Sequence, residues 1–272
     1  MDVLQLSERL RKHIRSLHER QGRDQHQEFL AEGVTVCREL LRSRLYRALF
    51  VVVRRGGDEE AWRLAREFAQ RNVPIYAAEG RRFESLFEVQ TPQDILAVVS
   101  YPERSAPLSG QPVLVLDGVS DPGNVGTIIR TAVWFDCPNV AVLPGSADPF
   151  QPKVVRASAG AIFHAIVRRV EATEPFLRQL RAQGYRLLGA QPDALNELPA
   201  MRIPRRAALV FGSEAHGLST AVRAQCDRLF RIPGSSAVDS LNVAVAAALT
   251  LYHCWLHRAH APVHPRSGRR SR

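Results

Sequence analysis

Three segments of the chain place polar side chains directly after apolar runs that are typical of buried strands. Residues 116–130 carry an asparagine, a glycine and an arginine, residues 210–219 carry a glutamate between two glycines, and residues 232–243 carry a serine and an asparagine. Open α/β sheets bind ligands outside the carboxyl ends of their strands. The pattern therefore predicts a ligand site built from three strand ends, with amide, carboxylate and guanidinium groups within it.

Each of these residues also has a purely structural interpretation. Asn124 can cap a helix whose first turn contains Gly126. Arg130 lies six residues after Asn124 on the same expected helix, where a surface salt bridge is an ordinary role. Glu214 can be a solvated turn residue, and Ser240 is expected to cap the last long helix. Taken singly, the segments leave both interpretations open.

Several common chemistries lack their signatures in this sequence. There is no G-x-x-x-x-G-K-[ST] loop, no G-x-G-x-x-G after a strand, no G-x-S-x-G elbow and no H-E-x-x-H helix. The four cysteines lie far apart without a C-x-x-C pair, so neither a zinc knuckle nor a disulfide framework is predicted. His253 and His257 have no carboxylate partner nearby in the sequence and are interpreted as structural. We therefore expect no metal site.

Composition places these motifs in a globular, strongly basic chain. Of 272 residues, 45% are hydrophobic and 24% are charged, which argues against wholesale disorder, collagen and coiled coil. The 37 basic and 27 acidic residues leave a formal net charge of +10, and only Lys12 and Lys153 are lysines. Arginine suits phosphate and stacks on bases, which favours a nucleic-acid partner, although a GC-rich genome produces the same bias.

The elements that must position the motifs fall into two α/β units. Runs of Val, Leu and Ala without alternation in the second half predict strands that are covered on both faces, hence a mostly parallel sheet with helices on both sides. In the first half, the pattern predicts a helix over 28–42. The expected organisation is a basic N-terminal extension at 1–22, an α/β domain at 23–100, a linker at 101–111, an α/β domain at 112–258 and a disordered basic tail at 259–272.

The sequence offers no membrane or secretion signal. The longest apolar stretch, residues 241–256, is interrupted by three polar residues and is predicted to be a buried helix, and residues 1–10 lack the apolar core of a signal peptide. We therefore expect a cytoplasmic protein without a membrane span.

Together, the three segments resemble the SpoU (TrmH) type of RNA ribose 2′-O-methyltransferase in the SPOUT superfamily. The resemblance covers residues 110–257, and a segment around Lys153-x-x-Arg156 also looks like the family. Less specifically, residues 29–33 and 91–93 resemble the family's small substrate-binding domain of the ribosomal-protein L30e kind. The sequence departs from the family at Asp94, Gly234 and Ser236. The matching motifs are Asn124-x-Gly126-x-x-x-Arg130, Gly212-Ser213-Glu214-x-x-Gly217-Leu218-Ser219, and Ile232-Pro233 followed by Ser240-Leu241-Asn242-Val243.

The resemblance implies both a fold and an activity. The fold is a C-terminal, mostly parallel sheet with a trefoil knot and helices on both faces, joined to a small N-terminal L30e-like α/β domain. The activity is transfer of a methyl group from S-adenosylmethionine to a ribose 2′-hydroxyl of RNA by a homodimer, with residues 241–256 suited to the dimer interface. An appended N-terminal domain favours ribosomal RNA over transfer RNA by analogy. The alternatives are a tRNA 2′-O-methyltransferase and a non-catalytic RNA-binding or ribosome-assembly factor with the same fold.

The resemblance also assigns the residues of the site. The main chain at Gly212, Ile232 and Leu241 is implied to hold the cofactor. Arg130 is implied to be catalytic, and because a guanidinium rarely deprotonates, we expect it to hold the target phosphate and stabilise the developing 2′-oxyanion rather than act as a general base. Glu214 is expected to orient Arg130 or Asn124. The supporting catalytic residues are Asn124, Glu214, Asn242 and Ser240, of which Asn124, Ser240 and Asn242 retain the helix-capping alternative.

Basic residues near the N-terminus are a further candidate for RNA binding. Phosphate contacts set affinity independently of sequence, so these side chains could grip an RNA backbone, and a solvated helix face is the alternative. The residues are Arg9, Arg11, Arg15, Arg20 and Arg23.

Overall fold

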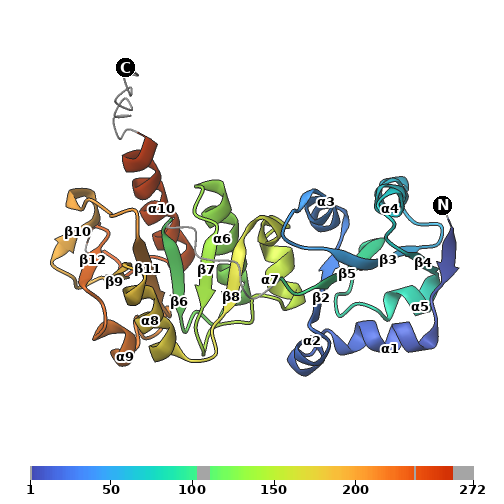
Figure 1. The fold of residues 1–272 in the computed structure, drawn as a ribbon, viewed down its shortest axis with the longest axis horizontal. Coiled ribbons are helices and arrows are strands. Elements are labelled where there is room, and N and C mark those ends of the chain that lie inside the picture. The colour runs from blue at the N-terminus through green and yellow to red at the C-terminus, as the bar shows by residue number, and fades with distance from the viewer. Residues whose placement is uncertain (1, 103–110, 236, 260–272) are drawn as a thin grey trace, which may run out of the picture.

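The computed structural model describes residues 2–102, 111–235 and 237–259, and its elements form two sheets that lie side by side along the long axis (Figure 1). Most of the predicted linker and all but the first residue of the predicted tail lie outside these ranges. Within the described residues, no helix combines the length and the apolar character that crossing a bilayer requires.

The first sheet, as described, has five strands in the order β1-β4-β3-β5-β2. Strands β1, β4 and β3 run parallel, and β5 pairs antiparallel with both β3 and β2. The strands are β1 (Val3–Gln5), β2 (Glu28–Glu32), β3 (Ala48–Arg54), β4 (Ile75–Ala78) and β5 (Ile95–Ser100), and the helices are α1 (Glu8–Ser16), α2 (Arg20–His26), α3 (Val34–Arg42), α4 (Glu59–Gln70) and α5 (Gly80–Glu84).

The expectation that residues 1–22 form a separate basic extension is wrong, because they are built into the first sheet. Strand β1 pairs with β4, with Val3 opposite Ile75. Leu6, Ile14 and Leu17 are buried in the core on one face of that sheet. Their loosely helical spacing therefore reflects a packed helix face rather than a solvated one.

The helix predicted over 28–42 begins later than expected. Residues 28–32 form β2, whose Phe29 is opposite Val99 of β5, and α3 starts only at Val34. Gly33 lies between them with φ +92°, in the left-handed region that favours glycine. A short apolar run that is buried on both faces cannot be told from a buried helix by periodicity alone.

The second sheet is wholly parallel across the described residues 111–235, which confirms the predicted α/β class. Its strand order is β10-β12-β9-β11-β6-β7-β8. The strands are β6 (Val113–Asp117), β7 (Asn139–Val142), β8 (Ile166–Arg169), β9 (Arg186–Ala190), β10 (Asn196–Glu197), β11 (Ala207–Gly212) and β12 (Arg228–Arg231). The helices are α6 (Pro122–Trp134), α7 (Pro152–Ala157), α8 (Thr173–Ala182), α9 (Thr220–Arg223) and α10 (Val243–Ala259), with short 3-10 turns at Ala161–His164 and Leu198–Ala200.

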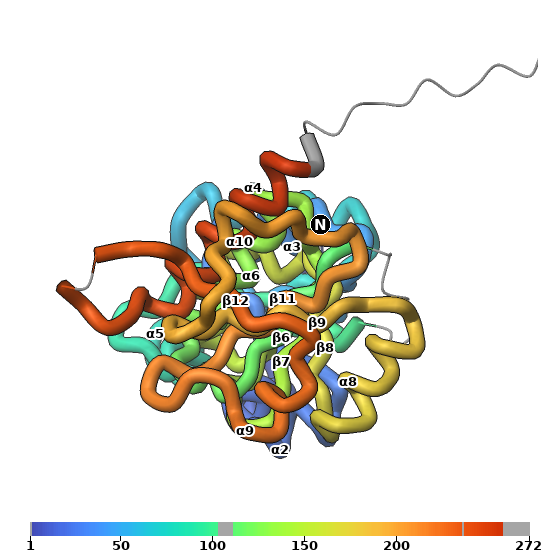
Figure 2. The backbone as a smooth tube through the Cα atoms, turned by 90° about the vertical axis from the view of Figure 1, so that its left-hand side faces the viewer, coloured from blue at the N-terminus to red at the C-terminus, as the bar shows by residue number. Residues whose placement is uncertain are grey.

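Helices cover both faces of this sheet, as predicted. Leu114 and Leu116 of β6 belong to the core that includes buried residues of α6, α7 and α10. Val113 and Val115 of the same strand point to the opposite core, which includes buried residues of α8 and α9. Figure 2 shows α6 and α10 on one side of the strands and α8 and α9 on the other. The trefoil knot stays a prediction.

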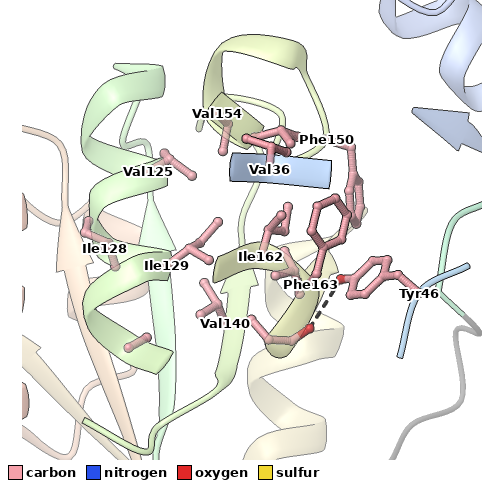
Figure 3. Packing of buried hydrophobic residues seen from close by; sticks show 14 of the residues in the cluster. Val36, Tyr46, Val125, Ile128, Ile129, Val140, Phe150, Val154, Ile162 and Phe163 are labelled. Carbon is pink, nitrogen blue, oxygen red and sulfur yellow. Dashed lines mark hydrogen bonds between the residues drawn. The ribbon is translucent and has the colours of Figure 1, made fainter. Parts of the chain in front are cut away.

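Aromatic side chains join the two halves into a continuous core. Phe29 of β2 lies with its ring centroid 5.1 Å from that of Phe150 and 6.1 Å from that of Phe163. Tyr46 contacts Phe163 edge to face at 5.5 Å, and its hydroxyl donates to the carbonyl of Ala165 at 3.3 Å (Figure 3). Burial raises the pKa of the Tyr46 phenol well above its usual range.

Ion pairs also cross the junction between the two halves. One of them engages Arg23, a residue that was expected to bind RNA. Arg23 is buried, and its guanidinium lies 2.6 Å from the carboxylate of Asp148 and donates to the carbonyls of Leu17 and His18. The expectation that Arg23 grips RNA is therefore wrong, because its side chain is committed to this junction. Further pairs across the junction are Arg156 with Glu32, Arg169 with Asp24, and His164 with Glu39.

Candidate active site

The first motif lies at the start of α6, and Asn124 is not its cap. The N-cap is Asp121, whose carboxylate accepts from the backbone N–H of Asn124 at 2.8 Å, and Pro122 occupies the first turn. Because Asp121 supplies the capping oxygen, the Asn124 side chain is available for contacts outside its own helix.

Those contacts join all three motifs. Glu214 Oε1 accepts hydrogen bonds from Asn124 Nδ2 at 2.7 Å and from Asn242 Nδ2 at 2.8 Å. Asn242 Nδ2 also lies 3.1 Å from Asn124 Oδ1. The structure thus brings together three of the residues that the sequence assigned to the site, with one carboxylate holding two amides through charge-assisted hydrogen bonds. The expectation that Glu214 orients Asn124 agrees with this geometry.

Two glycines fold the loop that carries Glu214. The backbone N–H of Ser213 donates to the carbonyl of Gly217 at 2.9 Å, and the N–H of Gly217 donates back at 2.8 Å. A Cβ on Gly212 would lie 2.1 Å from the backbone carbonyl carbon of Gly217, and Gly217 itself has φ +65°. Glycine is required at both positions for the chain to turn this tightly after β11.

Asn242, not Ser240, caps the last helix. The Asn242 side-chain oxygen accepts from the backbone N–H groups of Ala244 at 2.9 Å and Val245 at 3.3 Å, and α10 starts at Val243. The predicted start of this helix at residue 241 and the capping role of Ser240 are therefore wrong. Asn242 combines both interpretations, since its oxygen caps α10 while its amide nitrogen joins the cluster with Glu214.

A cleft of about 880 Å³ lies beside this cluster, at the carboxyl ends of β9, β11 and β12. Gly212, Ile232 and Leu241, the three predicted cofactor residues, all line it, and so do Ser240 and Glu214. The volume lies within the usual range for small-molecule sites. A second cleft of about 450 Å³ lies on the other side of loop 213–217 and shares several of its residues.

Arg130 is the predicted catalytic residue that the structure does not bring into the cluster. It lies on α6 six residues beyond Asn124, about 9 Å further along the helix axis. Its side chain is exposed, and within the described part of the chain it forms no hydrogen bond or ion pair with Asn124, Glu214 or Asn242.

Some residues of the cleft were not among the predicted site residues. Gln191 lines it directly after β9, and Arg231 and Glu197 line it as an ion pair with an N–O distance of 2.6 Å. Gln191 follows an apolar run, so the strand-end rule that found the three motifs also applies to it. Arg231 and Glu197 become neighbours only when β10 pairs with β12, which no local pattern indicates.

The described residues hold no group of three or more His, Cys, Asp or Glu side chains that could bind a metal ion. His253 instead has its Nε2 2.8 Å from the carbonyl oxygen of Met201, and its ring lies edge to face with that of His257. This agrees with the structural interpretation of these two histidines.

Comparison with known proteins gives a consistent result. The model of the SpoU rRNA methylase family matches residues 111–252, and that of the MRM3-like substrate binding domain matches residues 11–97. The chain is 32% identical over 243 residues to the 23S rRNA (guanosine(2553)-2′-O)-methyltransferase RlmP of Bacillus subtilis, covering 88% of this chain and 93% of that protein.

Solved structures are similar over nearly the whole chain. The SpoU methyltransferase AviRb of Streptomyces viridochromogenes in complex with AdoMet matches with a TM-score of 0.82 and 25% identity, covering 94% of this chain and 100% of that one. A putative RNA methyltransferase of the TrmH family from Porphyromonas gingivalis matches with a TM-score of 0.79 and 35% identity, covering 92% and 98%. With a family model matching more than half of its length and its three motifs meeting at one cleft, the chain belongs to the SpoU rRNA methylase family.

Proposed function

We propose that this chain transfers a methyl group from S-adenosylmethionine to a ribose 2′-hydroxyl of RNA, with ribosomal RNA as the substrate. The observation that carries the proposal is the Asn124–Glu214–Asn242 cluster beside a cleft that is lined by Gly212 and Leu241. The choice of ribosomal RNA is supported by the similar Bacillus subtilis protein, which is named as a 23S rRNA methyltransferase.

The residues of the cleft fit the proposed cofactor. Apolar side chains such as Phe230 and Val243 suit a flat base, while the ion pair of Arg231 and Glu197 suits a zwitterionic amino-acid end. A Cβ at Gly234 would meet nothing within 4 Å, so the main chain there is open to a ligand. When bound, S-adenosylmethionine supplies an electrophilic methyl group on a positively charged sulfur.

The protein's own residues then have to position the ribose and stabilise negative charge. Glu214 holds the amides of Asn124 and Asn242 in a fixed orientation at the edge of the cleft. Arg130 holds the phosphate of the target nucleotide and stabilises the oxyanion that develops on the 2′-oxygen. Because Arg130 lies outside the cluster in the free chain, bound RNA has to bring the phosphate to it.

An exposed apolar face supports the proposal that the chain works as a homodimer. Trp134 on α6 is 81% exposed, and Val245, Leu249, Tyr252 and Trp255 form an exposed stripe on α10. Ring centroids of Tyr252 and Trp255 lie 5.9 and 6.5 Å from that of Phe135, so the two helices share this face. Patches of this kind commonly mark protein interfaces. Arg130 lies one turn before Trp134, at the edge of that face.

The N-terminal half is the part of the chain that we expect to bind RNA. Fewer of the predicted arginines are available there for contacts with phosphate than the sequence indicates. Arg11 pairs with Glu8, Arg20 pairs with Asp24, and Arg23 is buried. Arg9 and Arg15 are exposed on α1 and form no ion pair with other described residues. Deletion of the whole N-terminal segment would also remove β1, so the pair of substitutions Arg9→Ala and Arg15→Ala is the sharper test. In a plot of the logarithm of RNA affinity against the logarithm of salt concentration, the double variant should have a shallower slope, by the contribution of up to about two phosphate contacts.

Two measurements test the proposal. Calorimetry should show that the purified chain binds S-adenosylmethionine in the presence of a chelator. Mapping of 2′-O-methyl groups in RNA from cells that lack the protein should reveal a site that is lost from ribosomal RNA and restored by the intact gene. Loss from transfer RNA instead would contradict the choice of substrate. Cofactor binding without any lost site would favour the alternative of a non-catalytic assembly factor.

A further inference from the structure

Gln191 occupies the point where three strand ends of the cleft meet. It follows β9 directly, and its backbone N–H donates to the carbonyl of Phe230 in β12 at 2.8 Å. Its side chain reaches toward the loop after β11, since a Cβ on Gly217 would lie 3.4 Å from Gln191 Oε1. The carboxamide therefore spans the wall of the cleft between β9 and the loop that carries Glu214.

The amide oxygen of Gln191 is buried and has no hydrogen-bond partner among the described residues. More than nine in ten buried polar groups in proteins have a partner, because an unpaired one costs free energy. An orphaned oxygen in the wall of a ligand cleft is satisfied when a bound ligand donates a hydrogen bond to it. This oxygen therefore points to a donor on the ligand.

The surroundings of this oxygen favour an uncharged aromatic donor. Phe230 and Ile232 give the adjoining wall an apolar surface that suits a flat base, and the charged pair of Arg231 and Glu197 suits the amino-acid end of the ligand. A neutral carboxamide matches the edge of adenine, on which an amino group donates beside a ring nitrogen that accepts. An ammonium group only donates and lacks this paired pattern, and the hydroxyls of a ribose lack the flat apolar face that the adjoining wall suits.

We propose that Gln191 determines the specificity of the cleft for the adenine of the cofactor, with Oε1 accepting a hydrogen bond from the exocyclic amino group and Nε2 donating to a ring nitrogen. The inference rests on the proposed function, because it takes S-adenosylmethionine as the ligand. It assigns the recognition of the base to a side chain, in addition to the main-chain contacts expected at Gly212, Ile232 and Leu241.

The test compares S-adenosylhomocysteine with S-inosylhomocysteine by calorimetry, because the second ligand replaces the amino donor by a carbonyl oxygen. The unmodified chain should prefer the adenosyl ligand by about tenfold or more, the ratio expected for one hydrogen bond to a buried polar group. Gln191→Met should reduce that preference to less than about threefold. Gln191→Glu should keep a preference, because a carboxyl group in either protonation state retains an oxygen that accepts.

Gln179→Met, at an exposed position of α8 on the far face of the sheet, is the matched control and should leave the preference unchanged. Thermal unfolding of each variant establishes that it is folded. An unchanged preference in Gln191→Met, or an equal loss of affinity for both ligands, would overturn the inference and leave the proposed function standing. Failure of the unmodified chain to bind either ligand would overturn both.

Discussion

Arg130 stands apart from the other candidate site residues, and its separation leads to a sharp prediction. The cleft is lined by Gly212, Ile232 and Leu241, whereas Arg130 is exposed on α6. Arg130→Ala should therefore leave cofactor affinity nearly intact while lowering single-turnover methyl transfer to RNA on the order of 10² to 10³-fold, the loss typical when a group that stabilises a developing anion is removed.

Arg130→Lys should also be severely impaired in transfer, because an ammonium cannot reproduce the planar fork of a guanidinium on phosphate. A cofactor isotherm run beside each transfer assay separates the roles. Near-normal methyl transfer by Arg130→Ala would show that Arg130 has no catalytic role. Weaker cofactor binding by that variant would indicate that Arg130 has a structural role instead.

Asn242 contributes to stability and to the site through different atoms, so two substitutions distinguish the contributions. Asn242→Ala removes the cap of α10 and should cost about 1 kcal/mol, or roughly 2 to 4 °C in melting temperature. Asn242→Asp keeps the capping oxygen but loses the donor to Glu214 and places a second negative charge beside it. The aspartate variant should melt close to the unmodified protein and yet transfer methyl groups more slowly. Equal activity in the aspartate variant and the unmodified chain would contradict a role for the amide.

The glycine of the first motif, Gly126, serves helix packing rather than chemistry. A Cβ on Gly126 would lie 2.5 Å from the Cβ of Ala157 and 2.8 Å from the carbonyl oxygen of Val154, so α6 and α7 approach closely only because this residue lacks a side chain. Gly126→Ala should destabilise the protein by about 1 to 3 kcal/mol through overpacking. Denaturant unfolding measures the change. The exposed neighbour Thr127→Ala is the control and should change stability little, and an equally mild effect of Gly126→Ala would contradict this packing argument.

How far the sequence predicts these elements depends on whether the signal is local. The parallel sheet follows from unbroken apolar runs, and the cleft follows from three polar segments at strand ends. Strand β2 was missed because a run buried on both faces has no distinguishing period. The cap of α10 was assigned to Ser240 because both candidate side chains are capping residues. Arg23 was assigned to RNA because its partner Asp148 is 125 residues away, a contact that only the fold creates.

The pair of Glu32 and Arg156 links the two halves of the molecule, and substitutions of these residues show how much it contributes to stability. The Glu32 side chain is 1% exposed, so Arg156→Met leaves a buried carboxylate without its partner. Such losses cost about 3 to 5 kcal/mol, and because Arg156 is itself one-third exposed, the lower end is expected. The double variant Glu32→Met with Arg156→Met should recover most of the melting temperature.

A surface pair provides the control for that junction. Arg42 pairs with Glu39 but is 64% exposed, so Arg42→Met should change the melting temperature little. If the double variant is as unstable as Arg156→Met alone, the unpaired buried charge of Glu32 is not the cause of the lower melting temperature.

Tyr101 at the same junction gives the molecule a predictable response to alkali. Burial, with a further contribution from the charge of Asp148, raises the pKa of Tyr101 from 10.0 to about 12. The folded state therefore keeps a proton that the unfolded state has lost, so this contribution to stability is complete below pH 10 and disappears as pH rises toward 12. Between pH 10 and pH 12, the melting temperature of Tyr101→Phe should fall less steeply than that of the unmodified protein. An equally steep fall in both proteins would show that other groups cause the loss of stability.

The hydrogen bonds from Asn124 and Asn242 to Glu214 become possible one after the other while the chain is being synthesised. Ribosomes make the chain from its N-terminus, so the first amide and the carboxylate exist before residue 242 and the helix it caps have been translated. Because domains near the N-terminus generally fold first during synthesis, the first sheet is complete while the Asn124–Glu214–Asn242 cluster still lacks its last member. Translation of the first residues of α10 is therefore the step that completes the cluster.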